Sequence, residues 1–139
     1  MNSETLVTKK LFIPVIPWMR LATAATRLTI NRWISQTRQR VFLQHSLLAG
    51  YQYYEAGTLW HRLRPGALLE LRRNPNNPVD PNAVEVYWRG HQLGHLPRTD
   101  NRIISRLLDR GMKLRAKIQA LRASKNPWER IQVRVEWEK

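Results

Sequence analysis

Hydrophobic and polar residues alternate along much of the chain, which is the two-residue period of a strand with one buried face. In residues 82–88 the hydrophobic positions on one face are Val84, Val86 and Trp88. The same alternation, or a continuous apolar and aromatic run, predicts strands over four more segments: 43–54, 67–73, 113–121 and 130–137. The dipeptide Arg89-Gly90 predicts a tight turn, which leads into a further strand over 91–96 and makes a hairpin.

The period changes to that of a helix between the fourth and fifth predicted strands. Hydrophobic pairs at 103–104 and 107–108 fall on one side of such a helix. Thr99 or Asp100 is a suitable N-cap, and Gly111 is a typical terminator. Three or four strands, one helix and two more strands predict a mainly β, α+β domain. Because no helix separates most of the strands, we expect an antiparallel sheet curled into a small barrel.

The first 42 residues differ in composition from the rest. They hold seven basic residues and one acid, Glu4, so their net charge is 7 − 1 = +6. We expect a basic N-terminal arm over 1–42, flexible or helical, and a folded domain over 43–139. A loosely docked arm, a nucleic-acid-binding arm and a membrane-surface or targeting segment all remain open. The longest apolar run, 11–19, contains two prolines and is too short to span a membrane.

Positive charge dominates the composition. Lys and Arg number 24 against 10 Asp and Glu, which gives a net charge of +14 and predicts a polyanionic partner, either nucleic acid or an acidic membrane surface. Cysteine is absent, which excludes disulfides, thiolate metal sites and cysteine nucleophiles. A cytoplasmic location, nucleoid-associated in a bacterium, is compatible with this composition.

Sequence signatures of catalysis are absent. The chain has no glycine-rich phosphate loop, no HExxH and no GxSxG motif. His91 and His95 would lie about 13 Å apart on a strand, from about 3.3 Å per residue, which is too far to share a metal. We therefore expect a protein that is not an enzyme and that has no metal site and no cofactor.

Residues 72–98 contain an unusual loop. Three prolines and four asparagines within residues 74–82 predict a rigid connection, because proline fixes φ and asparagine side chains form local turns. The loop could be an ordered connector between two strands or a preorganised binding rim. In the second case the acid Asp80 would lie among Arg72, Arg73 and Arg98.

At these residues the chain resembles the HIRAN domain family. The resemblance is carried by GYQYY at 50–54, RNPNNPVDPNAVEV at 73–86 and GHLPR at 94–98, and it covers roughly residues 43–122. It implies an OB-like β-barrel that binds DNA, and in the best understood members captures the 3′ end of a single strand. The family occurs attached to remodelling enzymes and as small stand-alone bacterial proteins, which this chain resembles.

The resemblance also implies the residues that contact DNA. Tyr53 corresponds to a base-stacking tyrosine, Asp80 to the acceptor of the 3′-hydroxyl and Asn77 to the asparagine of its loop. His95 and Arg98 correspond to the groups that hold phosphates. Tyr54 and Arg73 lie in the same motifs and complete the candidate set.

Two family positions are changed in this chain. Gln52 stands in place of an arginine, and Val79 in place of a second stacking aromatic residue.

The sequence thus predicts a DNA-binding module that recognises single-stranded DNA or 3′ ends in repair or at stalled forks. Two alternatives remain: a non-specific polyanion or RNA binder acting through the basic arm, and an adaptor that docks onto a helicase or nuclease.

Overall fold

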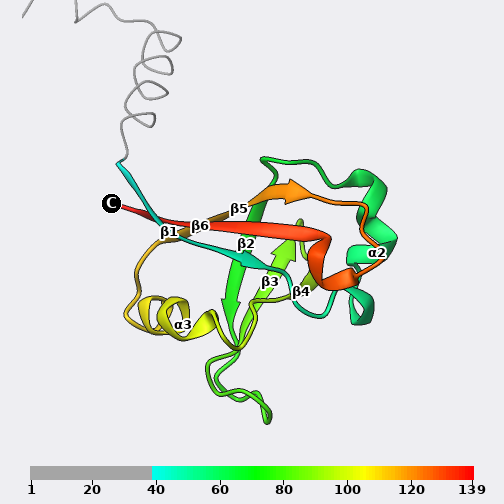
Figure 1. Ribbon diagram of the computed structural model, residues 1–139. Coiled ribbons are helices and arrows are strands. Elements are labelled where there is room, and N and C mark those ends of the chain that lie inside the picture. Colours follow the sequence, from blue (N-terminus) through cyan, green and yellow to red (C-terminus); the bar gives the residue numbers. More distant parts are fainter. Residues whose placement is uncertain (1–38) are drawn as a thin grey trace, which may run out of the picture. The chain divides into compact units, whose positions relative to one another are not determined.

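A six-stranded antiparallel sheet forms the centre of the protein. The computed structural model describes residues 39–139 (Figure 1). The strands are β1 (Arg40–Leu47), β2 (Leu68–Arg73), β3 (Val84–Trp88), β4 (His91–His95), β5 (Leu114–Leu121) and β6 (Ile131–Glu138). Their order across the sheet is β1-β6-β5-β2-β3-β4, so β5 and β6 bring β1 and β2 into one sheet. The predicted α+β class and the antiparallel sheet are confirmed.

Short helical segments fill the connections. Between β1 and β2 lie a 3-10 helix (Tyr51–Tyr53), α2 (Ala56–Leu59) and a second 3-10 helix (Trp60–Arg62). Between β4 and β5 lies α3 (Asn101–Asp109), and a 3-10 helix (Pro127–Glu129) precedes β6. Figure 1 shows α2 and α3 at opposite ends of the sheet, and the β2–β3 loop projecting beside α3.

The sheet does not close into a complete barrel. Its outer strands, β1 and β4, are joined only by an isolated bridge between Ala49 and His95. Ala49 N donates to His95 O at 2.9 Å, and His95 N donates to Ala49 O at 3.0 Å. The barrel is therefore a loose one, and this bridge fixes His95 against the chain that follows β1.

The alternation read from the sequence matches the burial of the strands. Val84, Val86 and Trp88 of β3 are buried and face the core. Ile131, Val133 and Val135 of β6 form a matching row. The β3–β4 turn also agrees with the prediction, because Arg89 (φ 49°) and Gly90 (φ 84°) both have positive φ, as a type I′ hairpin turn requires.

The predicted strand over 43–54 is wrong in its second half. Strand β1 ends at Leu47, and Gly50, with φ 81°, turns the chain into the 3-10 helix Tyr51–Tyr53. The left-handed conformation of Gly50 stops the extended run, although the residues on both sides are apolar or aromatic. Tyr53 and Tyr54 consequently do not alternate across a strand.

The predicted helix is confirmed, and one of the two predicted residues, Asp100, is its N-cap. Asp100 occupies the N-cap position of α3, but its side chain makes no cap hydrogen bond and instead accepts from Thr99 Oγ1 at 2.8 Å. Gly111, with φ 73°, follows the helix as predicted.

Most of the predicted basic arm, residues 1–38, lies outside the described residues, and 40–42 at its end belong to β1. In the range 39–139, no helix has the length and hydropathy needed to cross a membrane.

Candidate nucleic-acid interface

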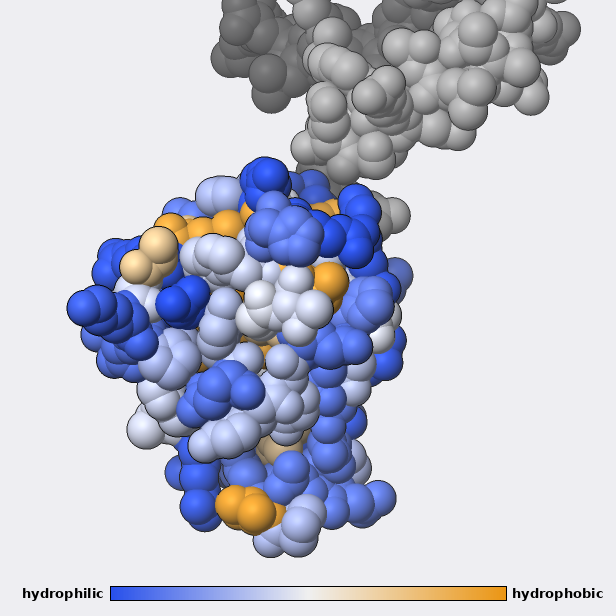
Figure 2. Space-filling view, turned by 90° about the vertical axis from the view of Figure 1, so that its right-hand side faces the viewer, coloured by the Kyte–Doolittle hydropathy of each residue, from blue (hydrophilic) through white to orange (hydrophobic). Residues whose placement is uncertain are grey.

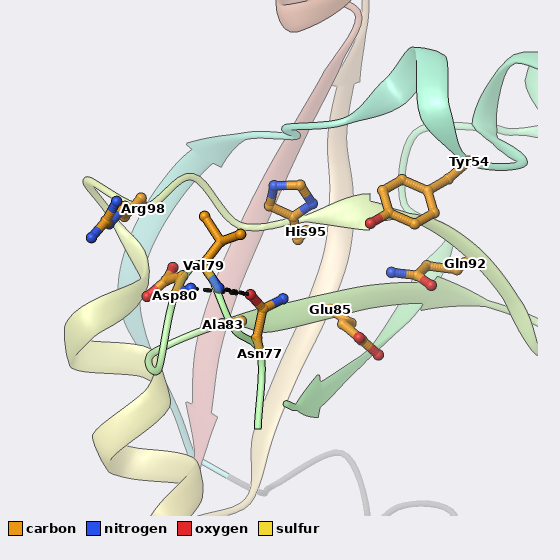
Figure 3. A pocket seen from close by; sticks show the side chains of 9 residues that line it. All are labelled: Tyr54, Asn77, Val79, Asp80, Ala83, Glu85, Gln92, His95 and Arg98. Atoms are coloured by element: carbon orange, nitrogen blue, oxygen red, sulfur yellow. Dashed lines mark hydrogen bonds between the residues drawn. The ribbon is translucent and has the colours of Figure 1, made fainter. Parts of the chain in front are cut away.

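A pocket of about 300 Å³ opens between β3, β4 and the β2–β3 loop (Figure 3). Its lining residues are Tyr54, Asn77, Val79, Asp80, Ala83, Glu85, Gln92, His95 and Arg98. In Figure 3, Arg98 and Asp80 lie at one end of the pocket, Tyr54 and Gln92 at the other, and His95 between them. The pocket therefore combines one cation, one imidazole, one phenol and two carboxylates.

The β2–β3 loop is held by side-chain hydrogen bonds to its own backbone. Asn77 Oδ1 accepts from the amides of Val79 (2.9 Å) and Asp80 (3.0 Å), and Asp80 Oδ1 accepts from the amide of Asn82 (2.9 Å). These are the local turns that asparagine and aspartate favour. The loop is thus both an ordered connector and the rim of the pocket.

A second element fixes the Asp80 carboxylate. Asn101, the first residue of α3, is only 1% exposed, and its Nδ2 donates to Asp80 Oδ2 at 2.6 Å. With Asn82, this bond uses two of the roughly four acceptor positions of a carboxylate. The remaining capacity is available to a donor that enters the pocket.

Glycines allow β4 and the turn after β1 to approach closely. A Cβ on Gly94 would collide with the carbonyl oxygen of Ala49, so the Ala49–His95 bridge requires glycine at this position. A Cβ on Gly50 would lie 2.9 Å from Tyr54 Cε2 and 3.0 Å from His95 Cε1. Tyr54 and His95 meet there edge to face, with ring centroids 6.0 Å apart.

His95 is held in its neutral form. Burial lowers the pKa of His95 below its ordinary value of 6.5, and the nearby carboxylates of Asp80 and Glu85 only partly oppose this effect. At neutral pH the uncharged imidazole has one N–H to donate and one nitrogen that accepts.

Five of the seven residues predicted for the site line this pocket: Tyr54, Asn77, Asp80, His95 and Arg98. Tyr53 does not, but its side chain is 77% exposed on the 3-10 helix that precedes Tyr54. Arg73 is also outside the pocket. It pairs with Asp109 of α3 at 2.8 Å and donates to the carbonyls of Ala83 (2.8 Å) and Pro81 (3.0 Å). Arg73 therefore joins the loop, β2 and α3.

The sequence analysis missed Ala83, Glu85 and Gln92 as pocket residues. Glu85 and Gln92 occupy outward positions on the paired strands β3 and β4, so strand alternation combined with the hairpin register was the available signal. Glu85 accepts from Asn74 Nδ2 (2.9 Å) and from the hydroxyl of Tyr87 (3.0 Å). This network orients a second carboxylate toward the pocket.

The surface around α2 is polar. Figure 2 shows mostly hydrophilic residues on this face, with apolar colour confined to small separate patches. One patch lies at the lower end, where the β2–β3 loop projects. Within this loop Val79 is 73% exposed.

No group of three His, Asp or Glu residues within 39–139 is arranged to hold a metal ion.

The sequence was also compared with models of known protein families. The model of the HIRAN domain matches residues 41–138. The chain belongs to the HIRAN domain family. HIRAN domains are DNA-binding modules, and residues 41–138 therefore form such a module.

One protein is similar to this chain in sequence, and two solved structures are similar to it in fold. The Fanconi-associated nuclease 1 homolog of Oryza sativa subsp. japonica is 30% identical over 93 residues, which are 64% of this chain but only 9% of that protein. The crystal structure of a protein from Lactobacillus plantarum has a TM-score of 0.63 at 24% identity and covers 73% of this chain and 98% of its own. The HIRAN domain of human HLTF has a TM-score of 0.56 at 22% identity, covering 72% and 80%. Both solved structures have the same fold as the part of this chain that they match.

Proposed function

We propose that the pocket of this HIRAN domain binds the 3′ end of single-stranded DNA and that the protein acts as a binding module, not as an enzyme. The observation that carries the proposal is the Asp80 carboxylate, which lines the pocket with acceptor capacity unused by Asn82 and Asn101. A terminal hydroxyl can donate to it. An internal nucleotide would place a phosphate there instead, and the two anions would repel each other.

The charge distribution in the pocket supports a nucleoside at its centre. Asp80 and Glu85 contribute two carboxylates, and His95 is neutral at pH 7, so Arg98 is the single full positive charge in the lining. A free phosphate is a poor ligand for such a centre. The exposed Arg98 guanidinium instead suits the phosphate that precedes the terminal nucleoside.

Tyr54 and Tyr53 supply the surfaces for base contact. Tyr54 is 39% exposed and braced edge to face by His95, and Tyr53 is exposed next to it. Stacking on a tyrosine is tolerant of sequence, and it contributes about 1–3 kcal/mol per base. Val79 offers an apolar contact where the family has a second aromatic ring, so we expect weaker binding than with two stacking faces.

The experiment is fluorescence anisotropy at near-physiological salt with three labelled oligonucleotides. They are a single strand with a 3′-hydroxyl, the same strand with a 3′-phosphate and a blunt duplex. The proposal requires the tightest binding to the free hydroxyl. Equal affinity for the first two would refute recognition of the end.

A charge-driven interaction is the second candidate, and the net charge of +14 favours it. A non-specific polyanion or RNA binder would bind all three oligonucleotides alike and would lose affinity steeply with added salt.

The rice relative is named a Fanconi-associated nuclease 1 homolog, which supports a link to nucleases. We therefore include in the proposal a role in repair or at stalled forks beside a nuclease or helicase. A cytoplasmic location, associated with the nucleoid in a bacterium, fits that role.

A further inference from the structure

The helix that follows the pocket carries a row of arginines on its solvent side. Arg102, Arg106 and Arg110 recur at four-residue spacing along α3 (Asn101–Asp109) and the residue after it, and all three are exposed. We call these three residues the arginine row. Four residues of helix rise about 6 Å, so the row extends over about 12 Å.

The row has no anionic partner in the part of the chain that the structure describes. Within residues 39–139 none of its three guanidinium groups makes an ion pair or a side-chain hydrogen bond. The only acid within α3 is Asp109, which pairs with Arg73 of β2 at 2.8 Å. The intramolecular acid is therefore used to hold the loop, not to neutralise the row.

The row also conflicts with what a stable helix favours. Like charges four residues apart repel each other on a helix surface. Arg102 stands in the first turn, where the positive end of the helix dipole disfavours a cation, whereas Arg106 and Arg110 stand at the C-terminal end of α3, where a cation is favoured. The repulsion within the row and the position of Arg102 are not offset by an ion pair among residues 39–139, which favours a partner outside the fold.

The row starts at the pocket. Asn101 binds Asp80, and the next residue along α3 is Arg102. Arg98, which lines the pocket, lies in the turn before α3, four residues before Arg102 in the sequence. A polyanion that leaves the pocket past Arg98 would reach the start of α3, where the arginine row begins.

We infer that the arginine row binds the phosphates of the strand whose 3′ end occupies the pocket, upstream of the terminal nucleotide. This inference rests on the proposed function. At about 3.4 Å per stacked nucleotide, a row of about 12 Å serves three or four nucleotides. With the terminal nucleotide in the pocket, the domain therefore holds about four or five nucleotides, with the end read in the pocket and the rest held by charge.

The test uses the full chain, the double variant Arg102→Gln/Arg106→Gln and 3′-hydroxyl oligonucleotides of two and eight nucleotides. We expect the wild type to bind the longer strand more tightly, and the double variant to lose most of that gain. The plot of log affinity against log salt concentration has a negative slope, and its magnitude should decrease by about 1.4 when two contacts on a single strand are lost. Binding of the dinucleotide and the preference for a 3′-hydroxyl over a 3′-phosphate should not change.

The matched control is Arg122→Gln/Lys125→Gln, which removes the same net charge from exposed residues outside α3. Equal losses in the two double variants, or no loss in either, would overturn the inference. Neutral methylphosphonate linkages at the third to fifth positions from the 3′ end should weaken binding by the wild type, and should cost the double variant much less, because only Arg110 of the row remains in it. Additive losses would also overturn it.

Stability separates a binding role from a structural one. Because the arginines repel one another, the row variant should melt at the same temperature as the wild type or higher; a lower melting temperature would show that the row supports the fold. Failure of the proposed function has a different signature, because the 3′-hydroxyl preference of the wild type would then be absent whatever the row does.

Discussion

Asn101 Nδ2 donates a 2.6 Å hydrogen bond to Asp80 Oδ2, and this bond joins the start of α3 to the loop that carries the proposed acceptor of the 3′-hydroxyl. Asn101 is 1% exposed, and its Oδ1 is buried without a hydrogen-bond partner among residues 39–139. A buried amide with one unpaired oxygen carries a cost in stability. The amide nevertheless donates to Asp80, and the bond fixes the orientation of this carboxylate.

We predict that Asn101→Ala lowers the free energy of unfolding by about 1–3 kcal/mol, because it removes a buried hydrogen bond to a charged group. It should also reduce the preference for 3′-hydroxyl ends, because Asp80 is then held only through its own loop. Urea denaturation and anisotropy measure the two effects. The control is Asn76→Ala, which changes an exposed asparagine of the same loop; an equal loss in the control would contradict the role of the Asn101 bond.

Gly94→Ala should be strongly destabilising. Its Cβ would collide with the backbone carbonyl of Ala49, which cannot move without breaking the bridge to His95. We expect a loss of more than about 2 kcal/mol, measured by urea or thermal unfolding. Gly57→Ala is the control, because its Cβ would make only ordinary contacts of 3.7 Å or more with Tyr51. Comparable stability of the two variants would show that the close approach is not required.

Arg73 should matter more than its ion-pair partner. Arg73→Met removes the contact with Asp109 and the bonds to the carbonyls of Pro81 and Ala83, whereas Asp109→Asn leaves those carbonyl bonds in place. We expect the first variant to loosen the loop and weaken DNA binding, and the second to have little effect. Hydrogen exchange of the amides of residues 74–83 measures the loosening. Equal exchange in both variants and the wild type would contradict this assignment.

Binding of the strand should strengthen as the pH falls through the pKa that His95 has in the complex. Burial holds the pKa of His95 below that value in the free protein, and a nearby phosphate favours the imidazolium and raises it in the complex. The complex therefore takes up a proton on forming, so the affinity is lowest above the pKa of the complex and rises as the pH falls through it.

The measurement is the dissociation constant between pH 5.5 and 7.5, with His95→Gln as the control. Folding stability changes in the opposite sense, because a lowered pKa in the folded state stabilises the fold above pH 6.5 and loses that contribution in acid. Each pH therefore needs a check that the protein is folded. An unchanged pH profile in His95→Gln would show that His95 is not the responsible group.

The strands and α3 could be predicted because their residues follow one period and their ends carry turn residues. The 3-10 helix at Tyr51–Tyr53 could not, since aromatic residues suit a strand and only the left-handed φ of Gly50 diverts the chain. The loop residues of the pocket were accessible from the motif. The outward positions of Glu85 and Gln92 follow from strand alternation, but their place at the pocket also depends on the β3–β4 register, whose shift between Val86 and Tyr87 the sequence does not reveal.

The separation of roles between Asp80 and Arg73 also required the structure. Both lie in one motif of the sequence, but Asp80 faces the pocket and Arg73 binds backbone carbonyls and Asp109. No local pattern distinguishes a charge that faces a ligand from one that holds a loop.

The most direct test of the account is the affinity of the protein for two single strands that differ only at the end, one with a 3′-hydroxyl and one with a 3′-hydrogen. A hydrogen bond to a charged group contributes about 1.5–3 kcal/mol, so the hydroxyl strand should bind about 10- to 100-fold more tightly. In Asp80→Asn this difference should shrink, while the loop bond to Asn82 can be kept by the remaining oxygen. Equal affinity of the wild type for the two strands would contradict the account.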